Sequence, residues 1–172
     1  MAGLIHLYCG DGKGKTTAAV GLAVRASGAG KRVVFTQFFK DGSSSEGRQL
    51  KRLENIQVFH ADTVRGFFWN MTPEQQAQAR RDYTALFRTV AEAAKNADLL
   101  ILDEIVSACG RGVVPEGEVL EFLRGRPEGL EVVLTGRDPS AGLQSMADYI
   151  TEMRKLRHPY DGGTAARKGI EF

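Results

Sequence analysis

A glycine- and lysine-rich segment near the N-terminus has the residue types of a phosphate-binding loop. The segment is CGDGKGKTT (9–17), and it lies between an apolar run, LIHLY, and an alanine-rich run, AAVGLAVRA. A P-loop has the form GxxxxGK[ST] between a strand and a helix. The chain has GKT at 14–16, but Cys9 stands where the pattern has its first glycine. Two further glycines, Gly10 and Gly12, leave the backbone free to fold around an anion.

This loop predicts a binding site for the phosphates of Mg-ATP or Mg-GTP. Backbone N–H groups and the N-terminus of the following helix bind phosphate oxygens in such loops. Lys15 would neutralise the phosphate chain, and Thr16 would offer its hydroxyl to Mg²⁺. A glycine-rich turn without a ligand is the alternative, but a tight turn has no use for a second cation, Lys13. The residues expected to contact the nucleotide here are Gly10, Asp11, Gly12, Lys13, Gly14, Lys15, Thr16 and Thr17.

A magnesium-bound nucleotide also needs a carboxylate, and the run LLILDE (99–104) ends in two. Ligand sites of parallel sheets lie at the carboxyl ends of the strands, so both motifs point to one edge. We therefore predict that Thr16, Asp103 and Glu104 hold Mg²⁺ or Mn²⁺; a solvated strand end is the alternative. Arg137, which follows another predicted strand, is expected to reach nucleotide phosphate, although a surface salt bridge fits it equally well.

Other polar residues are weaker candidates for the same edge of the sheet. Gln37 and Lys40 come at the end of the predicted strand 32–39. Glu46 and Arg48 lie in or beside the segment DGSSSEG, which predicts a loop that closes on a substrate.

The runs between these motifs predict strands that alternate with helices. The expected strands are 4–9, 32–39, 56–61, 98–104, 130–136 and 148–157. The expected helices are 16–29, 72–97, 115–127 and 140–147. DGSSSEG (41–47) is expected to be a turn or loop, and the tail after 157 to be partly irregular. This pattern indicates an α/β fold, a mainly parallel sheet sandwiched by helices, and with the phosphate loop it indicates a P-loop NTPase (RecA-like) fold.

Composition places the chain among globular proteins and excludes several partners. We expect one domain, 1–172, because the chain has 172 residues and shows no linker. A formal net charge of +2 is too balanced to indicate nucleic acid or an anionic membrane as the main partner. The two cysteines, Cys9 and Cys109, form no metal-type cluster and are expected to be buried thiols. No signal peptide or membrane-spanning run is evident, which predicts a cytoplasmic location.

Several segments together resemble the P-loop type of corrinoid adenosyltransferase, the ATP:cob(I)alamin or cob(I)yrinic acid a,c-diamide adenosyltransferases. The resemblance extends over nearly the whole chain and is most specific in the C-terminal part. The segments that carry it are GDGKGKTTAA, VVFTQFFKDG, RGFFWN, LILDE, RPEGLEVVLTGR and ADYITEMRKLRHPYDGGTAARKGIEF.

The resemblance implies an alkyl transfer with ATP as co-substrate and a corrinoid as substrate. A Co(I) corrinoid attacks the 5′ carbon of the ribose, an adenosyl–cobalt bond forms, and triphosphate leaves. The reaction serves adenosylcobalamin biosynthesis or salvage. The leaving group is highly charged, so its departure needs positive charge, which Lys15 as a catalytic residue, Lys13, the loop amides and Mg²⁺ would supply. No protein nucleophile is required, because cobalt is the nucleophile.

The resemblance also gives a role to the aromatic segment RGFFWN (65–70). In the family, aromatic residues here displace an axial ligand of cob(II)alamin and leave a four-coordinate cobalt that is easier to reduce. By match, Phe67 and Trp69 take this catalytic role. A core aromatic cluster is the alternative. Family members are typically homodimers, and a reductase that donates the electron is a possible partner.

Two other functions fit the same phosphate loop. A P-loop kinase for a small molecule would need an arginine-bearing lid, and RGRP (124–127) is the segment that most resembles one. A non-catalytic regulator that binds nucleotide or corrinoid would not need the residues of catalysis. The presence of Lys15, Thr16, Asp103 and Glu104 argues against that second alternative.

Overall fold

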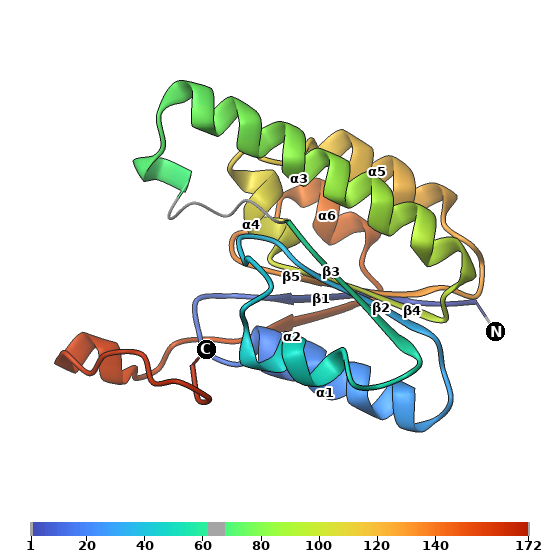
Figure 1. Cartoon of the computed structure of the whole chain (residues 1–172), viewed down its shortest axis with the longest axis horizontal. Helices are drawn as coiled ribbons and strands as arrows, with labels where there is room; N and C mark the ends of the chain where they lie inside the picture. Colours follow the sequence, from blue (N-terminus) through green and yellow to red (C-terminus); the bar gives the residue numbers. More distant parts are fainter. Residues whose placement is uncertain (1, 62–67, 172) are drawn as a thin grey trace.

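A computed structural model describes residues 2–61 and 68–171 of the chain, apart from the side chain of Trp69. In this part of the chain, six strands form one sheet in the order β3-β2-β4-β5-β1-β6, and every neighbouring pair is parallel (Figure 1). The predicted α/β fold with a parallel sheet is confirmed. The strands are β1 (Ile5–Cys9), β2 (Val33–Gln37), β3 (Ile56–His60), β4 (Leu99–Asp103), β5 (Glu131–Thr135) and β6 (Tyr149–Glu152).

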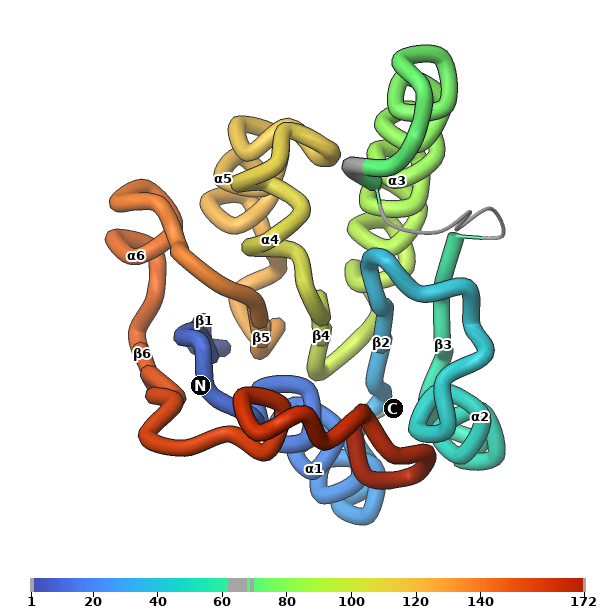
Figure 2. Tube along the Cα trace, turned by 90° about the vertical axis from the view of Figure 1, so that its left-hand side faces the viewer, coloured from blue at the N-terminus to red at the C-terminus, as the bar shows by residue number. Residues whose placement is uncertain are grey.

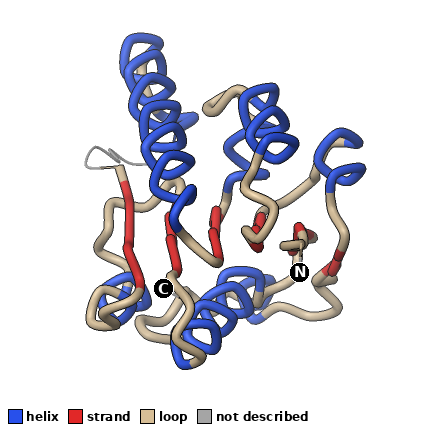
Figure 3. The backbone as a smooth tube through the Cα atoms, turned by 90° about the vertical axis from the view of Figure 1, so that its right-hand side faces the viewer, coloured by secondary structure: helices blue, strands red, loops and turns tan. Residues whose placement is uncertain are grey.

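Helices cover both faces of this sheet. Two of them, α1 (Lys15–Gly28) and α2 (Ser45–Leu50), lie on one face (Figures 2 and 3). Four lie on the opposite face, namely α3 (Pro73–Ala93), α4 (Ile105–Gly110), α5 (Glu116–Gly125) and α6 (Ala141–Met146). Three short 3₁₀ turns complete the elements: η1 (Phe68–Asn70), η2 (Ala94–Asn96) and η3 (Pro159–Gly162).

The sheet separates two apolar layers of the core. On the α1 side, Ala19 and Ala23 pack with the buried strand residues Phe35 and Ile101. The other layer is larger and includes Phe87 of α3. Small alanines on the buried face of α1 let this helix lie close to the sheet, which fixes the helix N-terminus near the strand ends.

Helix α3 begins with a capping box and a proline. The side chain of Thr72 accepts a hydrogen bond from the backbone of Gln75, Gln75 returns one to Thr72, and Pro73 takes the first helical position. Helix α3 then ends at Ala93, a few residues before the predicted end, and η2 continues to Asn96. A fraying last turn of this kind is common at helix ends.

Two short helices were not predicted. The segment 41–47 is not a loop throughout, because α2 begins at Ser45 with Ser44 as its N-cap. Helix α4 follows directly after β4, where the apolar run IVSACG gave no helical period over its short length. Both helices have six residues, fewer than two turns, and are held by tertiary packing, a contribution that local propensity does not contain.

One predicted strand needs correction. The predicted strand 148–157 is shorter, since β6 ends at Glu152, and all four of its residues are exposed at the edge of the sheet. β4 is buried at every position, whereas β1 alternates between buried and half-buried residues. The reason is the place of β1 beside this exposed edge strand, where cover is incomplete on one face.

Both cysteines are buried thiols, as predicted. Burial, with a smaller effect of the Glu116 charge, raises the pKa of the Cys109 thiol to about 12. In the described part of the chain, every helix is too short or too polar to cross a bilayer.

Candidate active site

The phosphate loop joins β1 to α1 at the carboxyl edge of the sheet and rests against the segment that follows β6. The backbone N–H of Gly12 donates to the carbonyl of Met153 at 2.6 Å. Gly10 has a positive φ of 101°, and a Cβ atom on it would lie 2.5 Å from the same carbonyl oxygen. A side chain at position 10 would therefore collide with backbone, so the loop requires glycine here. This requirement holds even though Cys9 replaces the first glycine of the P-loop pattern.

We predict that Gly10→Ala destabilises the protein by about 1–3 kcal/mol, from the strained φ and the contact with Met153. Gly21→Ala in α1 is the matched control, because a Cβ there meets nothing within 4 Å. Alanine in a helix interior should stabilise by roughly 0.5–1 kcal/mol. Urea unfolding of both variants checks the opposite signs, and equal effects of the two substitutions would contradict this account of the loop.

Lys15, the first residue of α1, points back into the loop. Its Nζ donates to the carbonyl oxygens of Gly10 at 2.7 Å and Gly12 at 2.8 Å. An ammonium group has three N–H donors, so one remains for a phosphate oxygen. Burial lowers the pKa of Lys15, and the nearby Arg137 charge lowers it further. The two carbonyls thus hold a partly desolvated cation in place before any ligand binds.

Thr16 and Asp103 meet at the end of β4, as the sequence predicts. The Thr16 hydroxyl lies 2.9 Å and 3.1 Å from the two carboxylate oxygens of Asp103. Asp103 is 1% exposed and also accepts hydrogen bonds from Thr135 at 2.7 Å and Gln37 at 3.2 Å. Burial raises the pKa of this carboxyl, while the hydrogen bond from Thr135 opposes the shift.

A carboxylate beside a threonine hydroxyl is the donor set that suits Mg²⁺, which prefers oxygen ligands and keeps several waters and phosphate oxygens. Among the described residues there is no cluster of three or more metal-ligating side chains. Such a cluster is not required for a magnesium ion that is shared with a nucleotide. The residues present therefore fit the predicted ion.

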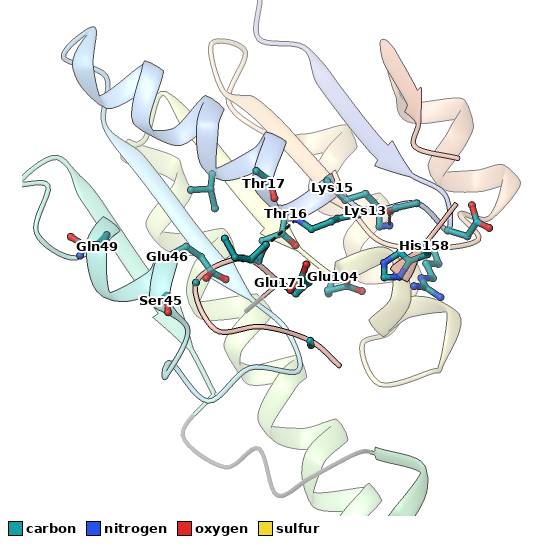
Figure 4. Close-up of a pocket in the computed structure, with 18 residues that line it drawn as sticks. Lys13, Lys15, Thr16, Thr17, Ser45, Glu46, Gln49, Glu104, His158 and Glu171 are labelled. Carbon is teal, nitrogen blue, oxygen red and sulfur yellow. Dashed lines mark hydrogen bonds between the residues drawn. The ribbon is translucent and has the colours of Figure 1, made fainter. Parts of the chain in front are cut away.

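Glu104 takes a different position from Asp103. Its backbone is in the left-handed region, with φ of 65°, and its N–H donates to the Thr135 hydroxyl at 2.9 Å. Its side chain lines a cavity of about 640 Å³ beside the phosphate loop (Figure 4). A non-glycine residue in this conformation is uncommon and marks a place where the chain turns to aim a side chain.

This cavity brings together most of the predicted site residues. The loop residues Asp11 to Thr17, Glu104 and Arg137 all line it. Asp103 lies beneath Thr16, and Gly10 contributes the carbonyl that holds Lys15. Phe67 lies outside the described residues, and Trp69 is described only as backbone in η1. The role predicted for these two aromatic residues stays a prediction.

Sequence reasoning assigned no role to the C-terminal tail in the site. The tail residues that line the cavity are His158, Ala166, Gly169, Ile170 and Glu171. Figure 4 shows Glu171 and Glu104 among the cavity residues, with Ser45 and Glu46 of α2 on one side of the view and His158 on the other. The strong resemblance of the tail to the family was the signal that could have indicated a role. The tail contains no sequence motif that predicts a particular chemistry.

Specific contacts fasten the tail to the phosphate loop. The backbone N–H of Lys155 donates to the Asp11 carboxylate at 2.9 Å, and Lys13 Nζ donates to the carbonyl of Ile170 at 3.1 Å. Hydrogen bonds from Arg167 lower the pKa of Glu171 to about 2. The loop and the tail thus form the two sides of one cavity.

Polar residues beneath α2 complete the site. Gln37 Nε2 donates both to Glu46 at 2.8 Å and to Asp103 at 3.2 Å. Its carbonyl oxygen accepts from the Ser44 hydroxyl at 2.6 Å. Gln37 and Glu46, weaker candidates from the sequence, therefore link α2 to the carboxylate of β4.

Comparison with solved structures supports the fold. The chain is similar to a KaiC-like protein, PH0186, from Pyrococcus horikoshii OT3, with a TM-score of 0.53 and 17% identity over 91% of this chain and 75% of that one. It is also similar to the RadB recombinase, with a TM-score of 0.55 and 18% identity over 92% and 77% of the two chains. Both likenesses bear out the RecA-like P-loop NTPase fold.

Comparison of sequences identifies the family. The model of the family described as ATP:corrinoid adenosyltransferase BtuR/CobO/CobP matches residues 1–172. A corrinoid adenosyltransferase of Escherichia coli K12 is 35% identical over 99% of this chain and 86% of its own length. Corrinoid adenosyltransferases of Pseudomonas aeruginosa and Salmonella typhimurium are 32% and 34% identical over 99% of this chain and over 84% and 86% of their own lengths. The chain therefore belongs to the ATP:corrinoid adenosyltransferase family.

Proposed function

We propose that this protein transfers the 5′-deoxyadenosyl group of ATP to the Co(I) centre of a corrinoid and releases triphosphate, in adenosylcobalamin biosynthesis or salvage. Family membership supports the reaction class. The observation that carries the proposal for this chain is the cavity of about 640 Å³, which is lined by Lys13 and Lys15 of the phosphate loop and by Arg137. Three cations around one cavity suit a leaving group with several negative charges.

In the proposed reaction, the electron pair of Co(I) forms the bond to C5′. The C5′–O bond breaks, and its electron pair leaves with the triphosphate. Lys15, the loop N–H groups and Lys13 stabilise the charge that develops on that oxygen and on the phosphates. Held by Thr16 and Asp103, with Glu104 nearby, Mg²⁺ or Mn²⁺ would supply further charge neutralisation. A desolvated Lys15 acts more strongly here than a lysine in water, because the local dielectric constant is low.

Further parts of the proposal rest on the family alone. Phe67 and Trp69 would keep an axial ligand away from cobalt and so ease its reduction. The protein would be a cytoplasmic homodimer and would receive an electron from a reductase.

An anaerobic assay tests the proposed reaction. The purified protein is mixed with chemically reduced cob(I)alamin, ATP and Mg²⁺, and loss of the Co(I) absorbance is followed with time. We expect light-sensitive adenosylcobalamin and inorganic triphosphate in equal amounts.

The phosphorus product separates the three candidate functions. Triphosphate is expected from adenosyl transfer, ADP from a small-molecule kinase, and neither from a regulator that only binds. ATP binding without any product from cobalamin or cobinamide would reject the proposed function.

A further inference from the structure

A second, smaller cavity lies beside α2, and its charged lining residues are all basic. It has a volume of about 200 Å³ and is lined by Lys40, Arg48 and Lys168 together with Ser43, Ser44 and Ser45. The three cations come from three separate segments of the chain, namely the β2–α2 connection, α2 itself and the C-terminal tail. Folding therefore brings together like charges that repel one another, which suits a place where an anion binds.

Two acidic residues adjoin lining residues in the sequence, and both are engaged in hydrogen bonds. The Asp41 carboxylate accepts hydrogen bonds from the backbone and hydroxyl of Ser43, and Glu46 accepts one from Gln37. Arg48 contacts the Ser45 hydroxyl only at 3.4 Å. The lining of the cavity therefore holds three cations and no carboxylate.

One wall of this cavity is held rigidly. Ser44 is 7% exposed, caps α2 by accepting from Gly47, and donates to Gln37 at 2.6 Å. Gln37 is itself bound to Asp103. Arg48 therefore projects from a helix that is tied to the carboxylate of the phosphate site.

The two cavities are neighbours. Ser45 lines both of them, and in the tail Lys168 lines the small cavity while the next residue, Gly169, lines the large one. Figure 2 shows the end of the tail running past α1 to lie beside α2. A ligand that fills the large cavity and extends over its rim at Ser45 would meet the basic cavity next.

We propose that the cavity between Lys40, Arg48 and Lys168 is a second anion subsite, separate from the phosphate loop, that binds a phosphate or carboxylate group of a substrate. The identity of the substrates rests on the proposed function. The anion could belong to the triphosphate of ATP or to the periphery of the corrinoid. The corrinoid is the favoured source, because the phosphate loop already supplies cations for ATP and the wide macrocycle must extend beyond the nucleotide cavity.

Corrinoids allow the two sources to be separated. Complete cobalamin carries a phosphodiester in its nucleotide loop, cobinamide lacks this phosphodiester, and the acid precursors carry carboxylates. An anion subsite for the corrinoid should therefore favour cobalamin over cobinamide, while a subsite for ATP should affect both reactions equally.

The test is the double variant Arg48→Gln, Lys168→Gln at low ionic strength. We expect the KM for cob(I)alamin to rise about three- to tenfold, since two exposed charge contacts are lost, with the KM values for cob(I)inamide and ATP unchanged. The rise should shrink in high salt. The single variants Arg48→Gln and Lys168→Gln are compared with Arg52→Gln, which removes one positive charge next to α2 from a residue that lines neither cavity. Arg48→Lys, which keeps the charge, should retain most of the affinity.

Other results would assign the subsite to ATP or overturn the proposal. A higher KM for ATP with both corrinoids would support the subsite and assign it to the triphosphate. Unchanged KM values for all three substrates, or a change equal to that of Arg52→Gln, would overturn the proposal. Equilibrium dialysis of hydroxocobalamin and dicyanocobinamide against the same variants, with ATP and Mg²⁺ present, measures binding without turnover. It tests the subsite even if no adenosyl transfer occurs, so the two proposals fail separately.

Discussion

Replacing Lys15 with alanine is expected to lower kcat for adenosyl transfer by about 10²–10³-fold, the usual effect of removing one preorganised charge from a transition state. Lys15 is buried in the phosphate loop and already fixed by the carbonyls of Gly10 and Gly12. Because its position does not depend on the ligand, little reorganisation is needed as charge develops on the leaving oxygen. The measurement is single-turnover loss of the Co(I) absorbance at saturating ATP.

A surface lysine serves as the control for this substitution. Lys95 forms an ion pair with Glu92 at 2.6 Å outside the cavity, so Lys95→Ala should keep full activity. Circular dichroism should show that both variants are folded. A Lys15→Ala enzyme with more than a tenth of the wild-type kcat would remove Lys15 from the proposed mechanism.

The second large effect is expected for Asp103→Asn. This change leaves Thr16 without a carboxylate partner and would deprive the proposed Mg²⁺ of a buried ligand, so kcat should fall at least about 10²-fold. Stability should respond differently. Since burial raises the pKa of Asp103, the folded state disfavours the charged form, and a neutral amide relieves that cost at pH 7. A new donor–donor contact with Gln37 opposes this gain.

These opposed terms predict a melting temperature within about 4 °C of the wild type when no ligand is present. Addition of ATP and Mg²⁺ should then raise the melting temperature of the wild type but not that of the variant. Asp98→Asn, at the opposite end of β4, is the control, because Asp98 pairs with Arg32 away from the cavity. A variant that still turns over and still gains stability from Mg²⁺ would contradict the metal assignment.

The layered fold was predictable because its signals are local. The strands are short apolar runs. The start of the helix at Pro73 is marked by the capping residues Thr72 and Gln75. The phosphate loop and the strand that ends in Asp103 could be predicted for the same reason, because each motif lies within a few consecutive residues. The parallel sheet then brings Thr16 and Asp103 together although 86 residues lie between them.

Features that depend on contacts between residues far apart in the sequence could not be predicted. Helix α2 exists because Ser44 caps it and Leu50 is buried in the layer below. The exposed strand β6 ends at Glu152, before its predicted end. The next residue, Met153, accepts a backbone hydrogen bond from Gly12 of the phosphate loop. The basic cavity needs Lys168 to lie beside Arg48, and no spacing along the chain expresses that approach.

The fastening of the tail to the loop has a consequence for how the protein is made. Synthesis on the ribosome proceeds from the N-terminus, so the phosphate loop emerges well before its cover, Gly169 to Glu171, which lies far later in the chain. Until then Lys13 lacks the carbonyl of Ile170, and the nucleotide cavity has no second wall. A nascent chain would therefore hold ATP weakly until residues 169–171 have been made and have reached the loop.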